Sequence, residues 1–178
     1  MTTARSRSAA IAVSLTAMVA SVATVGTAQA ADPLIITCTA NATQYYSPGL
    51  TLVDKPTNIT ASATYSCLGG GSVNSAQLSF DYTVYAGCLP TTSPVTTGIT
   101  RLDWNEGPDS EITSTFVVTR PVGQTIATTV GTVTSGQFNG YIVNQTGVYP
   151  ALDLLACLAP GGVTSSQGIL SLTLTQPF

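Results

Sequence analysis

The stretch AQLSFDYTVYAGC (residues 76–88) decides the fold class, because apolar and polar side chains alternate along its whole length. Successive side chains of a β-strand point to opposite faces, so this alternation places the apolar residues on one buried face. A helix would distribute the same residues around its whole axis. The apolar face carries Ala76, Leu78, Phe80, Tyr82, Val84, Ala86 and Cys88.

The same period of two recurs along the chain, at 59–67, 112–118 and 170–174. The sequence is rich in Thr, it is broken at short intervals by Gly, Pro, Asn and Ser, and strong helix formers are scarce, which is typical of an all-β domain. The stretch 151–158 fits either a strand or a helical turn, and TRPVGQT (119–125) reads as a hairpin. We predict about seven to nine strands, near 34–45, 57–67, 75–87, 97–104, 111–120, 124–134, 137–144 and 168–176.

Two cysteines, Cys67 and Cys88, lie on the apolar faces of their predicted strands. Their disulfides should therefore lie inside the fold, which favours an immunoglobulin-like β-sandwich of two packed sheets. A membrane barrel of the outer-membrane type is the rival architecture, since its strands alternate as well and about eight would fit the length. The four cysteines and the weak aromatic girdles speak against that rival.

Residues 1–30 have the features of a secretory signal peptide. Arg5 and Arg7 provide the positive start, 9–25 is an uncharged apolar run, and Ala28-Gln29-Ala30 is a small-x-small cleavage site. No second long apolar stretch follows, so we predict no transmembrane anchor. The expected product is a secreted, extracellular domain over residues 31–178.

The predicted mature chain is poor in basic residues. Lys55, Arg101 and Arg120 stand against all eight acidic residues of the sequence. Binding to nucleic acid needs several Lys or Arg side chains that neutralise phosphates. The composition therefore predicts that the protein binds no nucleic acid.

Cysteine usage agrees with export. Cys38, Cys67, Cys88 and Cys157 are the only cysteines, and an even number in an exported chain predicts two disulfides. We prefer the pairing Cys38–Cys67 with Cys88–Cys157, because the first bond would join two strands that fold back around 46–56. Neither a C-x-x-C motif nor a histidine is present, so no zinc site is predicted.

The absence of histidine excludes Ser-His-Asp and Cys-His mechanisms and removes the usual metal ligand. If all four cysteines are oxidised, no thiolate nucleophile remains. The triplet Gly69-Gly70-Gly71 lacks a following Lys and is read as a turn rather than as a phosphate loop. We therefore predict a protein without catalytic residues, metal or cofactor.

Four carboxylates and the single tryptophan gather in LDWNEGPDSE (102–111). The spacing of Asp103, Asn105, Gly107, Asp109 and Glu111 follows the ligand rhythm of an EF-hand loop. The match fails at Gly107 and Pro108, and no Glu occupies the bidentate position. A turn between two strands is the preferred interpretation, because Asn-Glu-Gly-Pro-Asp is turn chemistry.

Four residues are candidates for contact with a binding partner. Trp104 either plugs the end of the fold or stands exposed as a contact residue, with Asn105 beside it. Tyr45 and Tyr46 form either an exposed aromatic loop or a half-buried loop anchor.

Several motifs together resemble a group of small secreted immunoglobulin-like proteins of actinobacteria. They are TCTANATQYYSPGLT (37–51), YSC (65–67), WNEG (104–107), TRPVGQT with GTVTSGQFNG (119–140) and LLACLAPGGVTS (154–165). The resemblance spans most of the predicted mature chain. It implies a fold and a secreted habitat more than an activity, since the group is mostly functionally undefined.

Three functions fit these features. The first is a secreted, non-enzymatic interaction or adaptor module whose partner is another secreted protein, as a surface-associated protein or as a subunit of an exported assembly such as an antibacterial particle. The second is a carrier of a small apolar ligand, since the acidic composition rich in Thr, Gly and Ala is similar to that of chromoprotein apoproteins. The third is a protease inhibitor that presents SCLGGGS (66–72) or GCLPTTSP (87–94) as a rigid loop.

Overall fold

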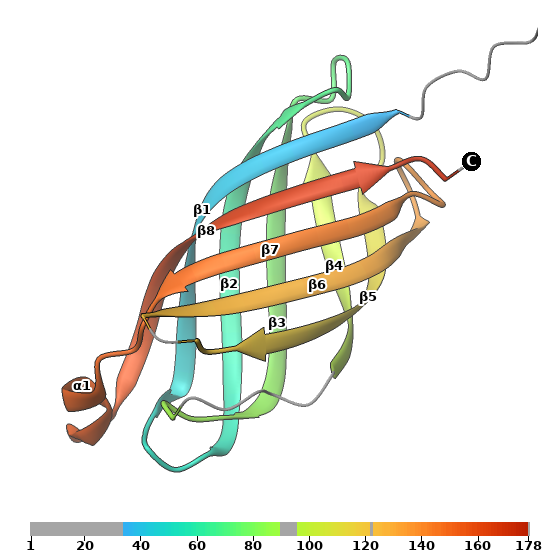
Figure 1. Ribbon diagram of the computed structural model, residues 1–178. Helices are drawn as coiled ribbons and strands as arrows, with labels where there is room; N and C mark the ends of the chain where they lie inside the picture. Colours follow the sequence, from blue (N-terminus) through green and yellow to red (C-terminus); the bar gives the residue numbers. More distant parts are fainter. Residues whose placement is uncertain (1–33, 90–95, 122, 178) are drawn as a thin grey trace, which may run out of the picture. The chain divides into compact units, whose positions relative to one another are not determined.

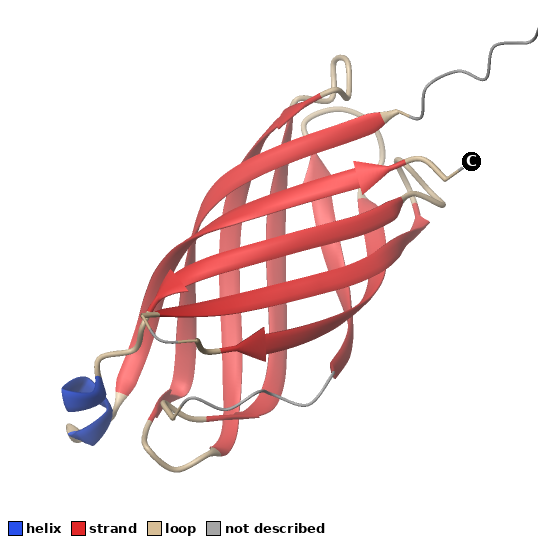
Figure 2. Cartoon of the chain, viewed as in Figure 1, coloured by secondary structure: helices blue, strands red, loops and turns tan. Residues whose placement is uncertain are grey.

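The computed structural model describes residues 34–89, 96–121 and 123–177, and β-strands make up most of them (Figure 2). No helix in these residues is long and apolar enough to cross a lipid bilayer. The predicted signal peptide, residues 1–30, lies outside the described residues. The elements are β1 (Ile35–Leu50), β2 (Lys55–Leu68), β3 (Ser75–Ala86), β4 (Thr96–Trp104), β5 (Ser110–Thr119), β6 (Gln124–Ser135), β7 (Ile142–Pro150), α1 (Leu154–Leu158) and β8 (Val163–Thr175).

The eight strands form one closed barrel in which each strand pairs with its neighbours in the sequence (Figure 1). The barrel closes where β1 pairs antiparallel with β8, in a register that runs from Ile35↔Thr175 to Tyr45↔Ser165. The all-β class and the number of strands are confirmed, but the prediction of two packed sheets is wrong. Strand alternation is the same in a sandwich and in a barrel, because both bury one face of every strand.

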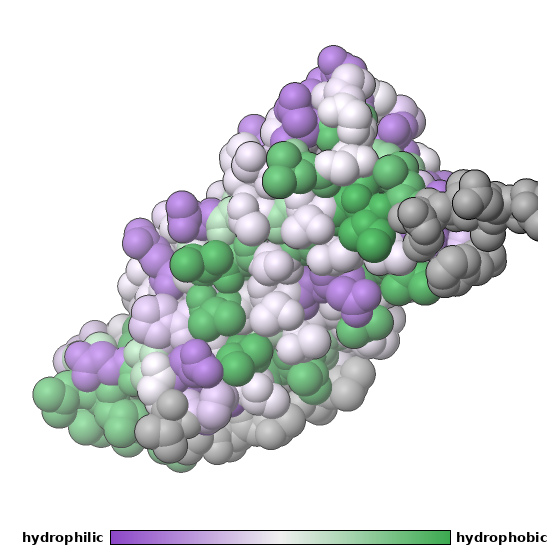
Figure 3. Space-filling model, turned by 45° about the horizontal axis from the view of Figure 1, so that its top comes forward, coloured by the Kyte–Doolittle hydropathy of each residue, from purple (hydrophilic) through white to green (hydrophobic). Residues whose placement is uncertain are grey.

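The inward faces of the strands are apolar and the outward faces are rich in hydroxyl groups. Leu170, Leu172 and Leu174 of β8 are buried, while Ser171 and Thr173 between them face outward. Figure 3 shows the apolar residues of one face as separate patches among polar and weakly polar ones. The rival barrel architecture therefore has the right closure, but its polar interior differs from the mainly apolar core observed.

Both disulfides have the predicted pairing. Cys38 and Cys67 face each other in the register between β1 and β2 and lie in the core. Cys88, just after β3, bonds to Cys157 of α1. The second bond joins positions separated by 69 residues of chain, and it anchors α1 to one end of the barrel.

Several strand limits depart from the prediction: β1 continues to Leu50 rather than ending near 45, and β8 begins at Val163 rather than near 168. The strand expected over 137–144 begins only at Ile142, because Gly136 and Gly140 adopt positive φ angles and turn the chain. The ambiguous stretch 151–158 contains the short helix α1, whose N-terminus is capped by the Asp153 side chain accepting from Leu155 N. The hairpin over 119–125 is confirmed.

Candidate functional site

The turn at 105–109 connects β4 to β5, and the preferred interpretation of this region as a hairpin connection is confirmed. Trp104 points into the barrel and is 7% exposed. Its indole Nε1 donates to Ser110 Oγ at 2.8 Å, and its ring meets Phe138 edge-on with 5.1 Å between ring centroids. Trp104 thus closes one end of the barrel beneath the 136–141 turn, as in the first of its two predicted roles.

The other candidate contact residues are not brought together with Trp104. The Asn105 side chain accepts from Asn74 N and Ser75 N at 3.0 Å each, so it holds the neighbouring loop in place. Tyr45 points outward and is more than half exposed, while the half-buried Tyr46 donates from its hydroxyl to Gln44 Oε1 at 3.1 Å. These tyrosines lie farther along the barrel wall, so the four residues do not form one site.

The acidic residues of 102–111 do not converge either. Asp103 points outward from β4 beside Arg101, with 4.0 Å between the nearest charged atoms. Glu106 and Asp109 are exposed in the turn. Within the part of the chain that the structure describes, no three Asp, Glu, Cys or His residues are placed to share a metal ion.

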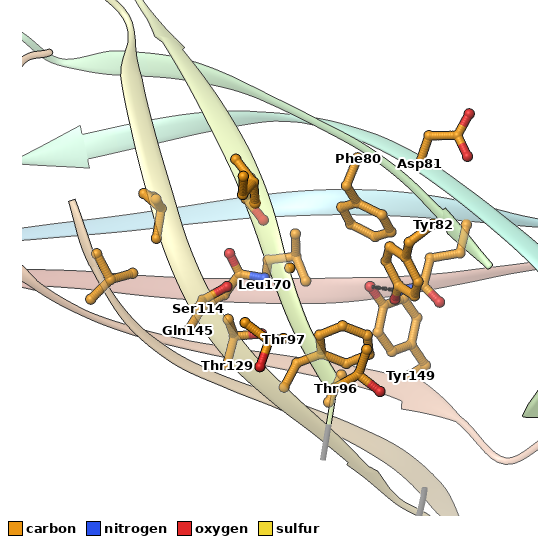
Figure 4. Close-up of a pocket in the computed structure, with 18 residues that line it drawn as sticks. Phe80, Asp81, Tyr82, Thr96, Thr97, Ser114, Thr129, Gln145, Tyr149 and Leu170 are labelled. Atoms are coloured by element: carbon orange, nitrogen blue, oxygen red, sulfur yellow. Dashed lines mark hydrogen bonds between the residues drawn. The ribbon is translucent and has the colours of Figure 1, made fainter. Parts of the chain in front are cut away.

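The barrel contains a cavity of about 250 Å³ that sequence reasoning did not predict (Figure 4). It arises where β3 and β4 separate. These two strands pair only from Ala76↔Trp104 to Ser79↔Arg101, and their remaining parts diverge (Figure 1). The packed core fills the other half of the interior, around Trp104.

The cavity extends from the interior to the wall between β3 and β4. Inward-facing residues of every strand except β2 line it, and so do Asp81, Thr97 and Ile99, whose side chains point outward from β3 and β4. Residues of both kinds can line one cavity only where it reaches through the sheet. The inward-facing lining residues are Gln44, Phe80, Tyr82, Thr96, Gly98, Thr100, Ile112, Ser114, Phe116, Ala127, Thr129, Val143, Gln145, Tyr149 and Leu170.

Aromatic rings form one side of the cavity. Phe80 and Tyr82 follow each other on the inward face of β3 with their ring centroids 5.1 Å apart. Tyr82 also contacts Phe116 of β5, at 4.8 Å between centroids. Figure 4 shows Phe80, Tyr82 and Tyr149 grouped together, whereas Asp81 points away from them. Apolar and aromatic surfaces of this kind are typical of small-molecule sites.

Hydroxyl and amide groups make up much of the remaining lining, and Figure 4 shows Ser114, Thr129 and Gln145 away from the aromatic group. Gln44 Nε2 donates to the Tyr149 hydroxyl at 2.6 Å, and Gln145 Oε1 accepts from the Tyr65 hydroxyl at 3.1 Å. Burial raises the pKa of Tyr149, and the nearby Tyr46 raises it further. The phenol therefore stays neutral at physiological pH, and the inward-facing polar groups of the lining are hydroxyls, phenols and amides, with the Asp81 carboxylate at the outer mouth.

Gly98 leaves room in the cavity because it has no side chain. A Cβ atom at this inward-facing position would have only the Phe116 ring within 4 Å, at 3.9 Å. The backbone of Gly98 is not in the left-handed region, so larger residues fit there without strain. A side chain at position 98 would therefore project into the cavity.

A second cavity of about 40 Å³ adjoins the first, and Tyr149 lines both. Arg120 lines the smaller cavity and donates from Nη1 to Leu89 O at 3.2 Å. Burial lowers the pKa of Arg120, and Tyr46 and Asp54 partly oppose this effect. The guanidinium group is the charged group in the described lining of this smaller cavity.

Comparison with protein-family models, with curated proteins and with solved structures gives no match. Sequence reasoning identified the inward faces of four stretches, 59–67, 76–88, 112–118 and 170–174, but missed the cavity. The one available signal was Gly98, a small residue at an inward position of a predicted strand.

Proposed function

We propose that this protein binds a small, uncharged, mainly aromatic ligand inside its barrel and carries it in the extracellular medium. The observation that carries this proposal is the cavity of about 250 Å³, whose inward-facing lining consists of aromatic rings, aliphatic groups and neutral polar groups. Barrels of eight strands have interiors that are either filled by side chains or large enough for one small ligand. The resemblance to secreted actinobacterial proteins and the predicted signal peptide support an extracellular place of action.

The size of the cavity supports a ligand with two fused rings. An apolar protein cavity of roughly 150 Å³ holds one benzene molecule. The present cavity is larger than that and has a flat aromatic side formed by Phe80 and Tyr82. We also propose that the protein is not an enzyme, because the inward-facing polar groups that line the cavity are hydroxyls, amides and phenols, and burial keeps the phenols neutral.

Naphthalene is expected to bind the wild-type protein with a dissociation constant on the order of 10–100 μM, from the usual binding free energy per ligand atom. Gly98→Leu should lower this affinity at least about tenfold, because the new side chain occupies the space of the ligand. The same substitution should leave the free energy of unfolding unchanged or raise it by about 0.5–1 kcal/mol, since glycine weakens a strand. Equilibrium dialysis measures the first effect and urea denaturation the second.

Thr132→Leu is the matched control, because Thr132 lies on the outward face of β6 and is exposed. This variant should bind naphthalene as the wild type does. Carriage of a ligand in the barrel is refuted if the wild-type protein takes up no naphthalene, or if Gly98→Leu binds it unchanged.

An interaction module, the first function predicted from the sequence, is the second candidate. One observation favours it. The short helix α1 exposes Leu154, Leu155 and Leu158, and the end of the molecule that carries α1 is apolar in Figure 3. Closure of the barrel pairs both terminal strands, so this surface is a better contact for a secreted partner protein than a sheet edge.

The interaction hypothesis predicts a complex that depends on these leucines. Leu155→Asp should abolish co-purification of a partner from culture medium, because a charge would replace the most exposed of the three. A monomeric mass of the native protein on light scattering, with nothing co-purified, contradicts the interaction hypothesis.

The protease-inhibitor hypothesis stays a prediction. The first proposed loop, 66–72, includes the end of β2, and residues 90–94 of the second proposed loop lie outside the described residues.

A further inference from the structure

In the part of the chain that the structure describes, the seam between β3 and β4 presents backbone groups that lie outside the ladder of these two strands. The register of these strands ends at Ser79↔Arg101. Two residues farther along each strand, the same register would place Asp81 opposite Ile99. The ladder in the described residues does not include this pair, although both residues line the cavity.

The direction of these backbone groups follows from the hydrogen bond at the start of the ladder. Asn105 N donates to Ser75 O at 3.0 Å, so Ser75 and Asn105 turn their backbone groups toward each other. Every second residue of an antiparallel strand faces the same neighbour. Asp81, three such steps from Ser75, and Ile99, three such steps from Asn105, therefore direct both N–H and C=O into the seam.

We propose that the ligand is a neutral aromatic carboxamide or lactam, with its rings in the cavity and its amide group in the seam between Asp81 and Ile99. This inference rests on the proposed function of ligand carriage. The edge of a strand offers a backbone N–H donor and a backbone C=O acceptor side by side. The ligand group that matches both must accept one hydrogen bond and donate another. An amide does so without bringing a charge into the aromatic part of the site.

The charges around the seam disfavour an anionic ligand. Asp81 carries a carboxylate at the mouth of the cavity, where one of its oxygens accepts from Asn58 Nδ2. Arg101, the nearest cation along β4, is exposed and lies 4.0 Å from Asp103, so its charge is already opposed. Among the described residues that line the larger cavity, none carries a positive charge.

Three probes with the same rings test the chemistry of the seam at neutral pH. They are naphthalene, 2-naphthamide and sodium 2-naphthoate, and equilibrium dialysis measures the binding of each to the full secreted protein. The amide should bind about tenfold more tightly than naphthalene, the gain expected from a net hydrogen bond. The carboxylate should bind most weakly.

Substitution of Ile99 by proline removes the backbone N–H that faces the seam. The hydrogen bonds between β4 and β5 are spared, because this N–H does not point toward β5. Ile99→Pro should abolish the roughly tenfold preference for 2-naphthamide over naphthalene. Ile99→Ala also loses most of the side chain that lines the cavity but keeps the N–H, so it should retain that preference whatever its affinity for naphthalene. Thr97→Pro, whose N–H faces the same seam, replaces Ile99→Pro if that variant does not fold.

The outcomes separate this inference from the proposed function. If none of the probes binds, ligand carriage itself fails. If naphthalene and 2-naphthamide bind equally and Ile99→Pro affects neither, carriage stands and the amide assignment is overturned. The assignment is overturned as well if 2-naphthoate binds most tightly and loses its affinity in Arg120→Gln, because the polar group then lies in the smaller cavity.

Discussion

Raising the pH above about 10 is expected to unfold the barrel steeply and cooperatively, because tyrosine phenols are buried in it. Burial raises the pKa of Tyr65, Tyr82 and Tyr149, and in each case nearby tyrosines raise it further. All three have a higher pKa in the folded state than in the unfolded chain. Their contribution to the free energy of unfolding is therefore fully present below about pH 10, and it is lost as the pH rises further toward the pKa of the folded state.

The size of this effect follows from proton linkage. Above the pKa of the unfolded chain, each neutral tyrosine lowers the free energy of unfolding by about 1.4 kcal/mol per pH unit. Three together give about 4 kcal/mol per pH unit, a large part of the 5–15 kcal/mol that typically holds a domain folded. Urea denaturation at a series of pH values measures the slope, and the ultraviolet absorbance of tyrosinate reports the ionisation.

Tyr65→Phe is an informative control for this prediction. At neutral pH the variant should be about 1 kcal/mol less stable, since the Tyr65 hydroxyl donates to Gln145 Oε1. At alkaline pH its slope should be smaller by about 1.4 kcal/mol per unit, because one ionisable phenol is missing. A free energy of unfolding that stays level through this pH range would show that the phenols are not buried as described.

Removing the Cys88–Cys157 disulfide by the double substitution to alanine is expected to lower the free energy of unfolding by about 4 kcal/mol. The bond closes a loop with a sequence separation of 69 residues, and loop closure of this length restricts the unfolded chain by about that amount. Cys157 is also the one buried residue of α1. A helix of five residues is unstable alone, so α1 should lose its protection from hydrogen exchange.

The double alanine variant of Cys38 and Cys67 provides the comparison. That bond closes a loop with a sequence separation of 29 residues, so its loss should also lower the free energy of unfolding by about 3–4 kcal/mol. It joins β1 and β2, which are also paired by backbone hydrogen bonds. Its loss should leave the protection of α1 unchanged, because the bond lies between β1 and β2. Equal hydrogen exchange of α1 in both variants would contradict the role assigned to Cys88–Cys157.

The candidate site illustrates what sequence patterns omit. Alternation placed Phe80 and Tyr82 on the buried face of β3, and the structure confirms that face. The pattern could not show that β3 and β4 separate beyond Ser79↔Arg101, since that depends on how the whole barrel is closed. Trp104 and Tyr45 drew attention because they are aromatic residues in recognisable motifs, yet they lie apart and neither lines the larger cavity.

The sequence by itself determined the all-β class and the buried face of the strands that contain 59–67, 76–88, 112–118 and 170–174, because these follow from local alternation. For the cysteines it gave a preference among three pairings, and the structure has the preferred one. Only the tertiary structure decided that β1 meets β8 and closes a single barrel around a cavity. The physical reason is that alternation with a period of two residues shows which face of a strand is buried. It does not state which strand lies beside it, because backbone hydrogen bonds between strands are the same for any neighbour.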